Sequence, residues 1–567
     1  MPTAYHAPHS RHRVLGLGNR SLVCAIALLG AACSSLTAQS VTPGLVRSRI
    51  EAHAASGRFV AAGEALGASA ELHEVYLARG FAPIWLDGGR WRAVADTALV
   101  LLREAPTHGL HAADYHLGAL ENLTQRLVDG SASLADRLDA EFLLTDGLLR
   151  YGSHLLLGRV DPTRVDPEWI EHRRVGRVVE RFVTALRGDG LRSFVTSAAP
   201  AHPEYARLQR GLADLLAIED RGGWGVLDDG SNLRPDSAHA RVPALRRRLR
   251  MSPDSLERQW ASSGNNSNVF DASLARAVKR FQARHGLEVD GVVGRRTRHA
   301  LNVSATERIH QVEVNLERWR WLPDDLGQRH VRINIPSYEG EFWTEGALVL
   351  RSRAIVGRLD RTTPSFTSSI EHLVLAPYWH VPPTIAAVDK LPLIQADPGY
   401  VAASRMTLFD AMTRQPIDAT TVDWSGISGA EFNRRFRLRQ EPGPANALGI
   451  VKLVFPNRHT VYVHGTPQTE LFARTTRALS SGCVRLEDVL QFAERLLSDQ
   501  PEWTAARIRQ VAAGGVERRV NLREPVPVYL LYFTAFVDPD GTLHLRPDLY
   551  QRDERVRSAS VAPIPGT

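Results

Sequence analysis

The feature that most constrains this chain is a strand-like segment that ends in a histidine and is followed, after a short spacer, by a cysteine. Apolar residues alternate up to His464, and glycine and proline then stop the strand (Val451, Leu453, Val461, Val463, Gly465 and Pro467). Cys483 follows in the segment 480–485, SSGCVR. Spaced apolar residues over 489–497 predict a helix just downstream, and a thiol near a helix start lies in positive potential.

These residue types suit acyl transfer through a thioester. A free cysteine has a pKa of about 8.5, so little of it is thiolate at neutral pH unless an imidazole takes its proton. The same imidazole can return the proton to a leaving amine. Gly482 lets the backbone approach a bound carbonyl, and the N–H groups of Gly482 and Cys483 are candidates for an oxyanion hole. Either His464 or Cys483 alone would more often be structural, but the pair with its glycine and proline neighbours favours a catalytic site.

The two segments resemble the L,D-transpeptidases with the YkuD catalytic domain. Their signature is a histidine, a spacer, and then Ser/Thr-His-Gly-Cys-apolar-Asn; the spacer here, 465–479, has fifteen residues. Ser481 stands where many members have histidine and Arg485 where many have asparagine, as in the large, scaffold-bearing branch of Gram-negative bacteria. The resemblance implies that Cys483 is the nucleophile, that His464 is the general acid/base, and that supporting roles fall to Tyr462, Ser480, Ser481 and Arg485.

The resemblance also implies a reaction and partners. Cys483 would attack the carbonyl of the third residue of a tetrapeptide stem, release the terminal D-alanine, and pass the acyl group to the side-chain amine of another stem. The product is a 3→3 cross-link in peptidoglycan, and the enzyme would serve cell-wall biogenesis and cell shape and be sensitive to carbapenems. The sequence has no metal-ligand motif and no phosphate-binding glycine loop, so we expect no metal and no cofactor.

Other functions stay open to different degrees. Water in place of the amine would make the chain an L,D-carboxypeptidase, and loss of catalysis would leave a non-catalytic wall-binding protein. Sortase-like transpeptidases usually separate histidine and cysteine by far more than the nineteen positions found here. NlpC-type hydrolases place the cysteine before the histidine, which argues against them.

The N-terminal segment 1–38 predicts an export signal. Three arginines precede the apolar run 22–32, which is too short to span a membrane, and small residues follow through Ala38. A mature periplasmic chain without a transmembrane segment would then hold Cys483 as its one cysteine, a thiol retained for reactivity. Residues 29–33 form a poor lipoprotein box, so a lipid anchor on Cys33 is the alternative.

The length of 567 residues and the changing patterns predict a multidomain α+β protein. Helical periodicity over 41–230 resembles the scaffold domain of the same branch, and its role would be architectural. Residues 240–302 resemble a three-helix peptidoglycan-binding type 1 domain through Phe-Gln at 281–282, Gly-Leu at 286–287 and Asp-Gly-x-x-Gly at 290–294. The loop around 264–267 interrupts that pattern.

A β-rich catalytic domain is expected over 329–509, with a lid inserted at 386–436. A hairpin within 516–553, which turns at 538–541, would complete it, and a disordered tail would follow over 554–567. Cleft-lining positions match by resemblance at Tyr378, Trp379 and Asn446. His380 is a rival for the base, but its prolines and its spacing to Cys483 favour His464.

The net charge of +7 suits an anionic partner such as the cell wall. Of the 69 basic residues only Lys279, Lys390 and Lys452 are lysine, and the 66 arginines are dispersed along the chain. No motif that reads DNA or RNA is present, so we expect no nucleic-acid partner.

Overall fold

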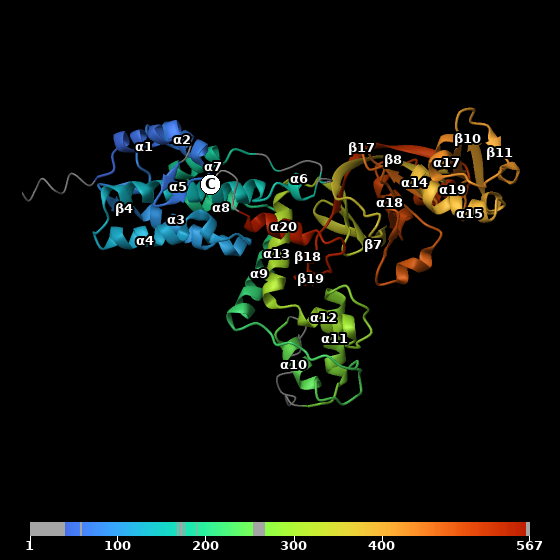
Figure 1. Cartoon of the computed structure of the whole chain (residues 1–567), viewed down its shortest axis with the longest axis horizontal. Helices are drawn as coiled ribbons and strands as arrows, with labels where there is room; N and C mark the ends of the chain where they lie inside the picture. The colour runs from blue at the N-terminus through green and yellow to red at the C-terminus, as the bar shows by residue number, and fades with distance from the viewer. Residues whose placement is uncertain are drawn as a thin grey trace, which may run out of the picture.

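The computed structural model describes residues 40–562, except 57–58, 167–168, 170–173, 175, 189 and 253–266. Figure 1 shows a helical region at one end, a small helical module below the middle, and a β-rich region at the other end. This arrangement confirms the expected multidomain α+β class. The predicted export signal, with Cys24 and Cys33, lies outside the described residues, as does most of the loop around 264–267. Within the described part, no helix is both long and apolar enough to cross a bilayer.

The N-terminal region is built around one long helix, α5, Leu134–Leu157. Ser133 begins it with a capping box, in which its hydroxyl accepts from the Asp136 N–H and the Asp136 carboxylate accepts from the Ser133 N–H. Nearly every side of α5 is buried because helices surround it, which accounts for its many leucines. Its neighbours are α1 Pro43–Ser56, α2 Ser69–Ala78, α3 Ala93–Arg103, α4 Leu117–Val128, α7 Val178–Arg187 and α8 Gly190–Ala198. The remaining elements are short: β1 Val60–Ala61, β2 Glu64–Ala65, β3 Leu86–Asp87, β4 Arg90–Trp91, η1 Ala105–His108, η2 Ala112–Tyr115 and α6 Pro162–Val165.

The small module has the three predicted helices, α10 Val242–Arg250, α11 Ala272–Arg284 and α12 Arg295–Asn302. Leucine, valine and phenylalanine side chains at helical spacing meet in its core (Leu245, Leu249, Leu274, Val278, Phe281 and Leu301). The glutamine of the Phe-Gln pair, Gln282, has a structural role, because its side-chain amide holds the loop that follows α11. Its Nε2 donates to Asp290, and its Oε1 accepts from the Gly291 N–H.

Two helices flank the module in sequence, α9 Pro203–Asp220 and α13 Ala305–Arg320. They pack against each other and join the three regions (Figure 1). Inside this junction Glu317 and Arg320 form a buried ion pair at 2.6 Å. The same groups reach other elements: Glu317 accepts from the Val160 N–H and from the indole of Trp321, and Arg320 donates to the carbonyl of His108.

A mixed nine-stranded sheet forms the β-rich region, in the order β15-β7-β16-β14-β13-β8-β17-β5-β6. Because β6 also pairs with β7, the sheet closes on itself around an apolar core, which α18 Val489–Leu496 and α19 Ala505–Ala513 cover. The strands are β5 Arg329–Asn334, β6 Glu339–Thr344, β7 Ala347–Gly357, β8 Phe366–Leu375, β13 Val451–Val454, β14 Val463–His464, β15 Ala478–Ser480, β16 Val484–Leu486 and β17 Arg518–Leu531.

The C-terminal part differs from the prediction in two ways. Residues before the hairpin form β17, which lies inside the sheet between β8 and β5 because alternate side chains from Val520 to Leu530 are buried there. The hairpin itself is β18 Ala535–Val537 with β19 Leu543–Leu545, and it packs on α9 and α13. The predicted disordered tail is wrong over most of its length: Asp553–Val561 is a helix, α20, held against α13 by buried Val556 and by the ion pair between Arg318 and Asp553.

The predicted lid has its own fold. Its apolar core contains Trp424, Phe432 and Phe436 and lies apart from the core of the large sheet. A four-stranded sheet in the order β11-β10-β12-β9 supports this core. Its strands β9 and β12 pair with each other, and they lie just before and just after the predicted insertion in the sequence. The elements are β9 Trp379–His380, α14 Pro383–Ile385, the π-helix η4 Ala386–Lys390, α15 Leu391–Ala396, α16 Tyr400–Ala403, β10 Met406–Asp410, β11 Pro416–Ile417, η5 Ala419–Thr421, α17 Gly429–Arg435 and β12 Phe436–Gln440.

Candidate active site

The register of three neighbouring strands collects the candidate residues on one face of the sheet. His464 of β14 is paired with Lys452 of β13 and with Arg485 of β16. Side chains alternate between the two faces of a strand, so Tyr462 lies on the face of His464, and Cys483 on the face of Arg485. The residues between them, Val463 and Val484, are fully buried in the apolar core on the other face. The alternation read from the sequence therefore places the imidazole and the thiol on one surface.

Cys483 is half-buried and is held by Tyr462. The Tyr462 hydroxyl hydrogen-bonds the thiol and, in turn, the indole of Trp379. Burial raises the pKa of Cys483, while a hydrogen bond from the Tyr462 backbone and the charges of Lys452 and Arg485 act in the opposite direction. Burial, with the neighbouring thiol, also raises the pKa of Tyr462. The resting site therefore holds a protonated thiol among groups that stabilise the thiolate.

The source of positive potential differs from the prediction. Cys483 is followed directly by β16, and α18 begins only at Val489, so the thiol does not lie at a helix start. Positive charge comes instead from Lys452, whose ammonium lies 3.9 Å from the centre of the Tyr462 ring, and from Arg485.

His464 is buried and neutral in this arrangement. Its Nδ1 lies 2.5 Å from the carbonyl oxygen of Gly465, and the ring also contacts the carbonyl of Leu448. Burial, and next the charge of Arg485, lower the pKa of His464 to about 3. Among the described residues its recorded hydrogen bonds go to these backbone groups and not to Cys483. The role of His464 as general acid/base stays a prediction. It requires the imidazole to give up its hydrogen bond to one of these carbonyls, since catalytic hydrogen bonds often form only when substrate is bound.

The loop before Cys483 is fixed by its own hydrogen bonds. Ser480 is buried; its hydroxyl donates to the Cys483 carbonyl at 2.5 Å and accepts from the Gly482 N–H at 3.1 Å. The Gly482 carbonyl accepts from Thr363 at 2.8 Å. Gly482 has φ +112°, a conformation that favours glycine. Because its N–H already bonds Ser480, Gly482 is not a free oxyanion donor here, which corrects that part of the prediction and leaves the Cys483 N–H as the candidate.

Ser481 connects the loop to the lid. Its hydroxyl accepts from Arg361 at 3.2 Å, and the same guanidinium forms an ion pair with Asp389 in the lid's π-helix. The next lid residue, Lys390, lies 5.6 Å from the centre of the Trp379 ring. The π-helix therefore approaches the site on two sides, and such helices are frequent at functional sites. Arg485 in turn donates to Gln468 at 3.2 Å.

The three cleft residues have different surroundings. Trp379 is buried and hydrogen-bonds Tyr462, so it belongs to the thiol's environment. Asn446 is buried, donates to the carbonyls of Pro377 and Glu441, and accepts from the Leu448 N–H, which is a backbone-shaping role. Tyr378 lies under the guanidinium of Arg439, 4.3 Å from the ring centre.

Sequence reasoning missed two groups at the site. Lys452 carries one signal that could have found it, since it is one of three lysines in the chain and stands in the alternating run before His464. Arg361 and Asp389 carry none, because only the docked lid brings them together with Ser481.

Comparisons with known proteins agree with this arrangement. Residues 328–526 match the L,D-transpeptidase catalytic domain (YkuD), 240–301 the "Putative peptidoglycan binding domain", and 70–212 the "Scaffold domain". A curated "Putative L,D-transpeptidase" from Haemophilus influenzae is 35% identical over 251 residues, which are 44% of this chain and 50% of that protein. The chain thus spans about half the length of this relative.

A solved structure was also found. The crystal structure of the L,D-transpeptidase (residues 123–326) from Xylanimonas cellulosilytica matches with 15% identity over 54% of this chain and 99% of that chain. Its TM-score of 0.17 is too low to carry an argument. The catalytic-domain match contains every candidate residue of the site, from Tyr378 to Arg485. The chain therefore carries a YkuD-type L,D-transpeptidase catalytic domain, a peptidoglycan-binding domain and a scaffold domain.

Proposed function

We propose that this protein is a peptidoglycan L,D-transpeptidase that forms 3→3 cross-links through a thioester on Cys483. The observation that carries the proposal is the position of Cys483, half-buried on the lid side of the sheet, hydrogen-bonded to Tyr462 and facing two cations. Peptidoglycan is the proposed substrate because a wall-binding domain and a transpeptidase domain occur in one chain.

In the proposed acylation step, Cys483 Sγ bonds to the carbonyl carbon of the third stem residue, and the C–N bond to the terminal D-alanine breaks. The thiol is protonated at rest because burial raises its pKa, so its proton must leave as the bond forms. His464, neutral at rest, accepts that proton and gives it to the departing amine. Lys452 and the Tyr462 hydroxyl stabilise the thiolate in between.

In the second step the side-chain amine of another stem attacks the thioester carbonyl. The new C–N bond replaces the C–S bond, the amine loses a proton, and Cys483 regains one. No external energy is required, because the thioester conserves the energy of the peptide bond that it replaced. The Cys483 N–H is the proposed donor to the oxyanion of each tetrahedral intermediate.

We further propose that the protein works outside the cytoplasm, where peptidoglycan is found. The segment 1–38 would direct export, and Cys33 would be acylated only if the lipoprotein alternative holds. Intact-mass analysis of the periplasmic protein distinguishes cleavage near Ala38 from a lipid-bearing N-terminal cysteine.

Cross-linking is tested with purified protein and disaccharide-tetrapeptide. Mass spectrometry should find dimers that lack one D-alanine and an acyl adduct of the stem peptide on Cys483. A carbapenem should likewise form its own acyl adduct on Cys483. Cys483→Ala should lose dimers and adduct alike, and His464→Ala should slow acylation by about 10²- to 10⁴-fold. Undiminished dimers with Cys483→Ala would overturn the mechanism, and tripeptide without dimers would identify a carboxypeptidase.

A further inference from the structure

The loop that carries Cys483 is held by the turn that follows β7. Thr363, at the end of this turn, is fully buried. Its hydroxyl donates to the Gly482 carbonyl at 2.8 Å and accepts from the Gly357 N–H at 2.8 Å. Gly357, the last residue of β7, permits this close approach, because a Cβ there would lie 2.7 Å from the Thr363 nitrogen. Thr363 therefore connects the nucleophile loop to the end of a strand in the large sheet.

The hydrogen bond to Gly482 also orients the candidate oxyanion donor. The Gly482 carbonyl and the Cys483 N–H belong to one peptide group, and such groups are planar and almost always trans, so the two bonds point in opposite directions. A donor fixed on the carbonyl therefore fixes the direction of the N–H. The same hydrogen bond polarises the peptide group and strengthens its N–H as a donor. This matters for catalysis because a donor stabilises an oxyanion only when it already points at the developing charge.

The backbone of Thr363 is held in turn by the segment that follows β19. The Tyr550 hydroxyl accepts from the Thr363 N–H at 3.3 Å and donates to the Gly357 carbonyl at 2.5 Å. Arg552 donates to the Thr363 carbonyl at 3.1 Å and to the hydroxyl of buried Ser365 at 2.6 Å. The N–H, the carbonyl and the hydroxyl of Thr363 are thus all engaged, which leaves this residue little freedom to turn.

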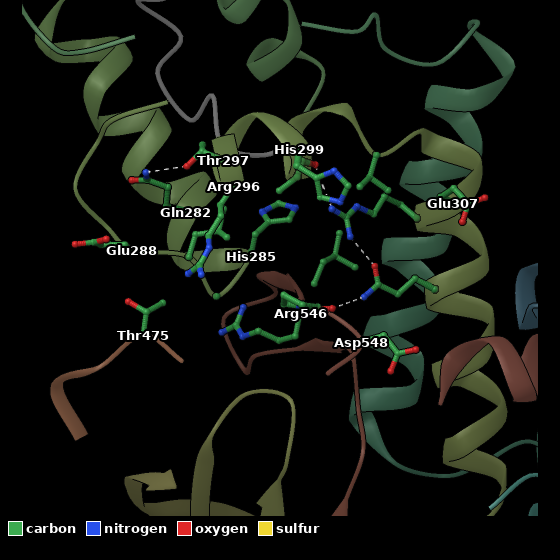
Figure 2. Close-up of a pocket in the computed structure, with 18 of the residues that line it drawn as sticks. Gln282, His285, Glu288, Arg296, Thr297, His299, Glu307, Thr475, Arg546 and Asp548 are labelled. Atoms are coloured by element: carbon green, nitrogen blue, oxygen red, sulfur yellow. Dashed lines mark hydrogen bonds between the residues drawn. The ribbon is translucent and has the colours of Figure 1, made fainter. Parts of the chain in front are cut away.

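A single carboxylate holds the segment that carries Tyr550 and Arg552. Asp548 accepts from the Tyr532 hydroxyl at 2.6 Å and from the N–H groups of Arg552 and Asp553, each at 2.9 Å. Figure 2 shows Asp548 in the wall of a cavity of about 1050 Å³ beside the small module. An Nη of Arg552 also lies 3.5 Å from the carboxylate of Asp166, which belongs to the N-terminal helical region. The segment therefore connects that region to the turn after β7.

We propose that Thr363 is a positioning residue for acylation. Its hydroxyl aims the Cys483 N–H at the oxyanion, and Tyr550 and Arg552 hold Thr363 in place. The inference rests on the proposed function, since it assigns the support of the oxyanion donor in the same site. Tyr550 and Arg552 lie beyond residue 526, where the match to the catalytic domain ends. A complete site then requires residues from outside that domain match.

Two reactions of Cys483 in the full-length protein separate this role from a general structural one. Acylation by a carbapenem places negative charge on the carbonyl oxygen, whereas alkylation by iodoacetamide displaces iodide and forms no oxyanion. Thr363→Val loses the hydroxyl at nearly constant size. Its maximal acylation rate should fall by about 10- to 100-fold, less than for loss of a donor, because the N–H is turned and not removed. The binding constant of the carbapenem and the alkylation rate should not change, and Thr363→Ser should acylate like the parent.

Tyr550→Phe is a second variant that tests the same role from a half-buried position. It loses the hydrogen bonds to the Thr363 N–H and the Gly357 carbonyl, so it should slow acylation by a smaller factor and leave alkylation unaltered. Tyr338→Phe is the matched control, because Tyr338 packs against the same small apolar cluster as Tyr550. Among the described residues the Tyr338 hydroxyl bonds none of these groups, and both of its rates should equal those of the parent.

An acylation rate in Thr363→Val equal to that of the parent would overturn the proposal. An equal loss of acylation and alkylation would do so too, as would a Thr363→Ser variant as slow as Thr363→Val. If Thr363→Val does not fold, the same comparison in Tyr550→Phe decides. A parent protein that forms an adduct with neither the carbapenem nor the tetrapeptide would refute the proposed function, whereas an acylating parent with unaffected variants would refute only the role of Thr363.

Discussion

At the residue scale, the reactivity of Cys483 depends on opposed contributions to one pKa. Burial raises the pKa of the thiol, and Lys452, Arg485 and the hydrogen bonds of Tyr462 lower it. Because burial is the larger effect, the thiolate fraction is small at neutral pH and grows as the pH rises through the raised value. Removing any one cation should raise the pKa further.

Lys452→Met tests this balance. The variant loses a positive charge beside Cys483, so at pH 7 its reaction with iodoacetamide should slow by about tenfold for each unit that the thiol pKa rises. The rate should still increase with pH, with its midpoint moved upward. The control is Lys279→Met, exposed on α11 and far along the chain from the thiol. Coincident pH profiles for parent and Lys452→Met would show that this lysine does not tune Cys483.

The sequence was sufficient to locate those candidate residues whose position in the fold depends on short-range pattern. Alternation and the spacer predicted which strand carries His464 and Tyr462 and where Cys483 follows. Lys452 could not be placed, because its position beside His464 depends on the register between β13 and β14. The hydrogen bond from the Gly482 N–H to Ser480 was equally out of reach, since it depends on loop dihedral angles.

At the scale of elements, the lid is connected to the site by the π-helix Ala386–Lys390. Asp389 pairs with Arg361, which also bonds Ser481 beside the nucleophile. A second arginine, Arg358, lies 3.6 Å from the same carboxylate. The ion pairs therefore connect the predicted lid to the loop that carries Cys483, and we expect them to favour a closed lid.

Asp389→Asn should loosen this closure. Loss of partly exposed ion pairs costs about 1 kcal/mol, so the open lid should be roughly fivefold more populated and the amides of η4 and α15 should exchange hydrogen faster. Arg434→Gln, exposed on α17 of the same lid, serves as the control. Unaltered exchange in Asp389→Asn would mean that apolar packing alone closes the lid.

Elements were predicted well where periodicity was strong and poorly where two signals competed. The three helices of the small module and the helix after Cys483 follow their apolar spacing. The alternation of apolar residues continues from β17 into the hairpin without a break. The sequence therefore did not reveal that the strand in the large sheet ends at Leu531. Helix α20 carries Asp553 and Glu554 in its first turn, but its single buried apolar residue, Val556, gave no visible stripe.

At the scale of the whole molecule, α13 is the junction through which the three regions contact one another. The ion pair of Glu317 and Arg320 is almost completely buried, with the side chains 3% and 0% exposed. Buried pairs of this kind add little when intact, yet the loss of one partner leaves a charge without compensation. The junction should therefore be sensitive to a single substitution.

Glu317→Gln should lower the free energy of unfolding by about 3–5 kcal/mol, because Arg320 stays buried without its counter-charge. Denaturant unfolding followed by far-UV circular dichroism measures the change. The control, Arg192→Gln, breaks the exposed pair with Glu104, in which the side chains are 64% and 39% exposed, and should cost at most about 1 kcal/mol. Similar losses in both variants would show that burial of the pair is unimportant.

The position of β17 has a consequence for the order in which the protein becomes active during synthesis. The ribosome adds Cys483 dozens of residues before it completes Leu531, yet β8 and β5 have no common neighbour until that last strand is available. A nascent or truncated chain that stops earlier carries the thiol but lacks the middle of its sheet. We therefore expect the surroundings of Cys483 to form only after β17 is complete, and a chain that ends before this strand to be inactive.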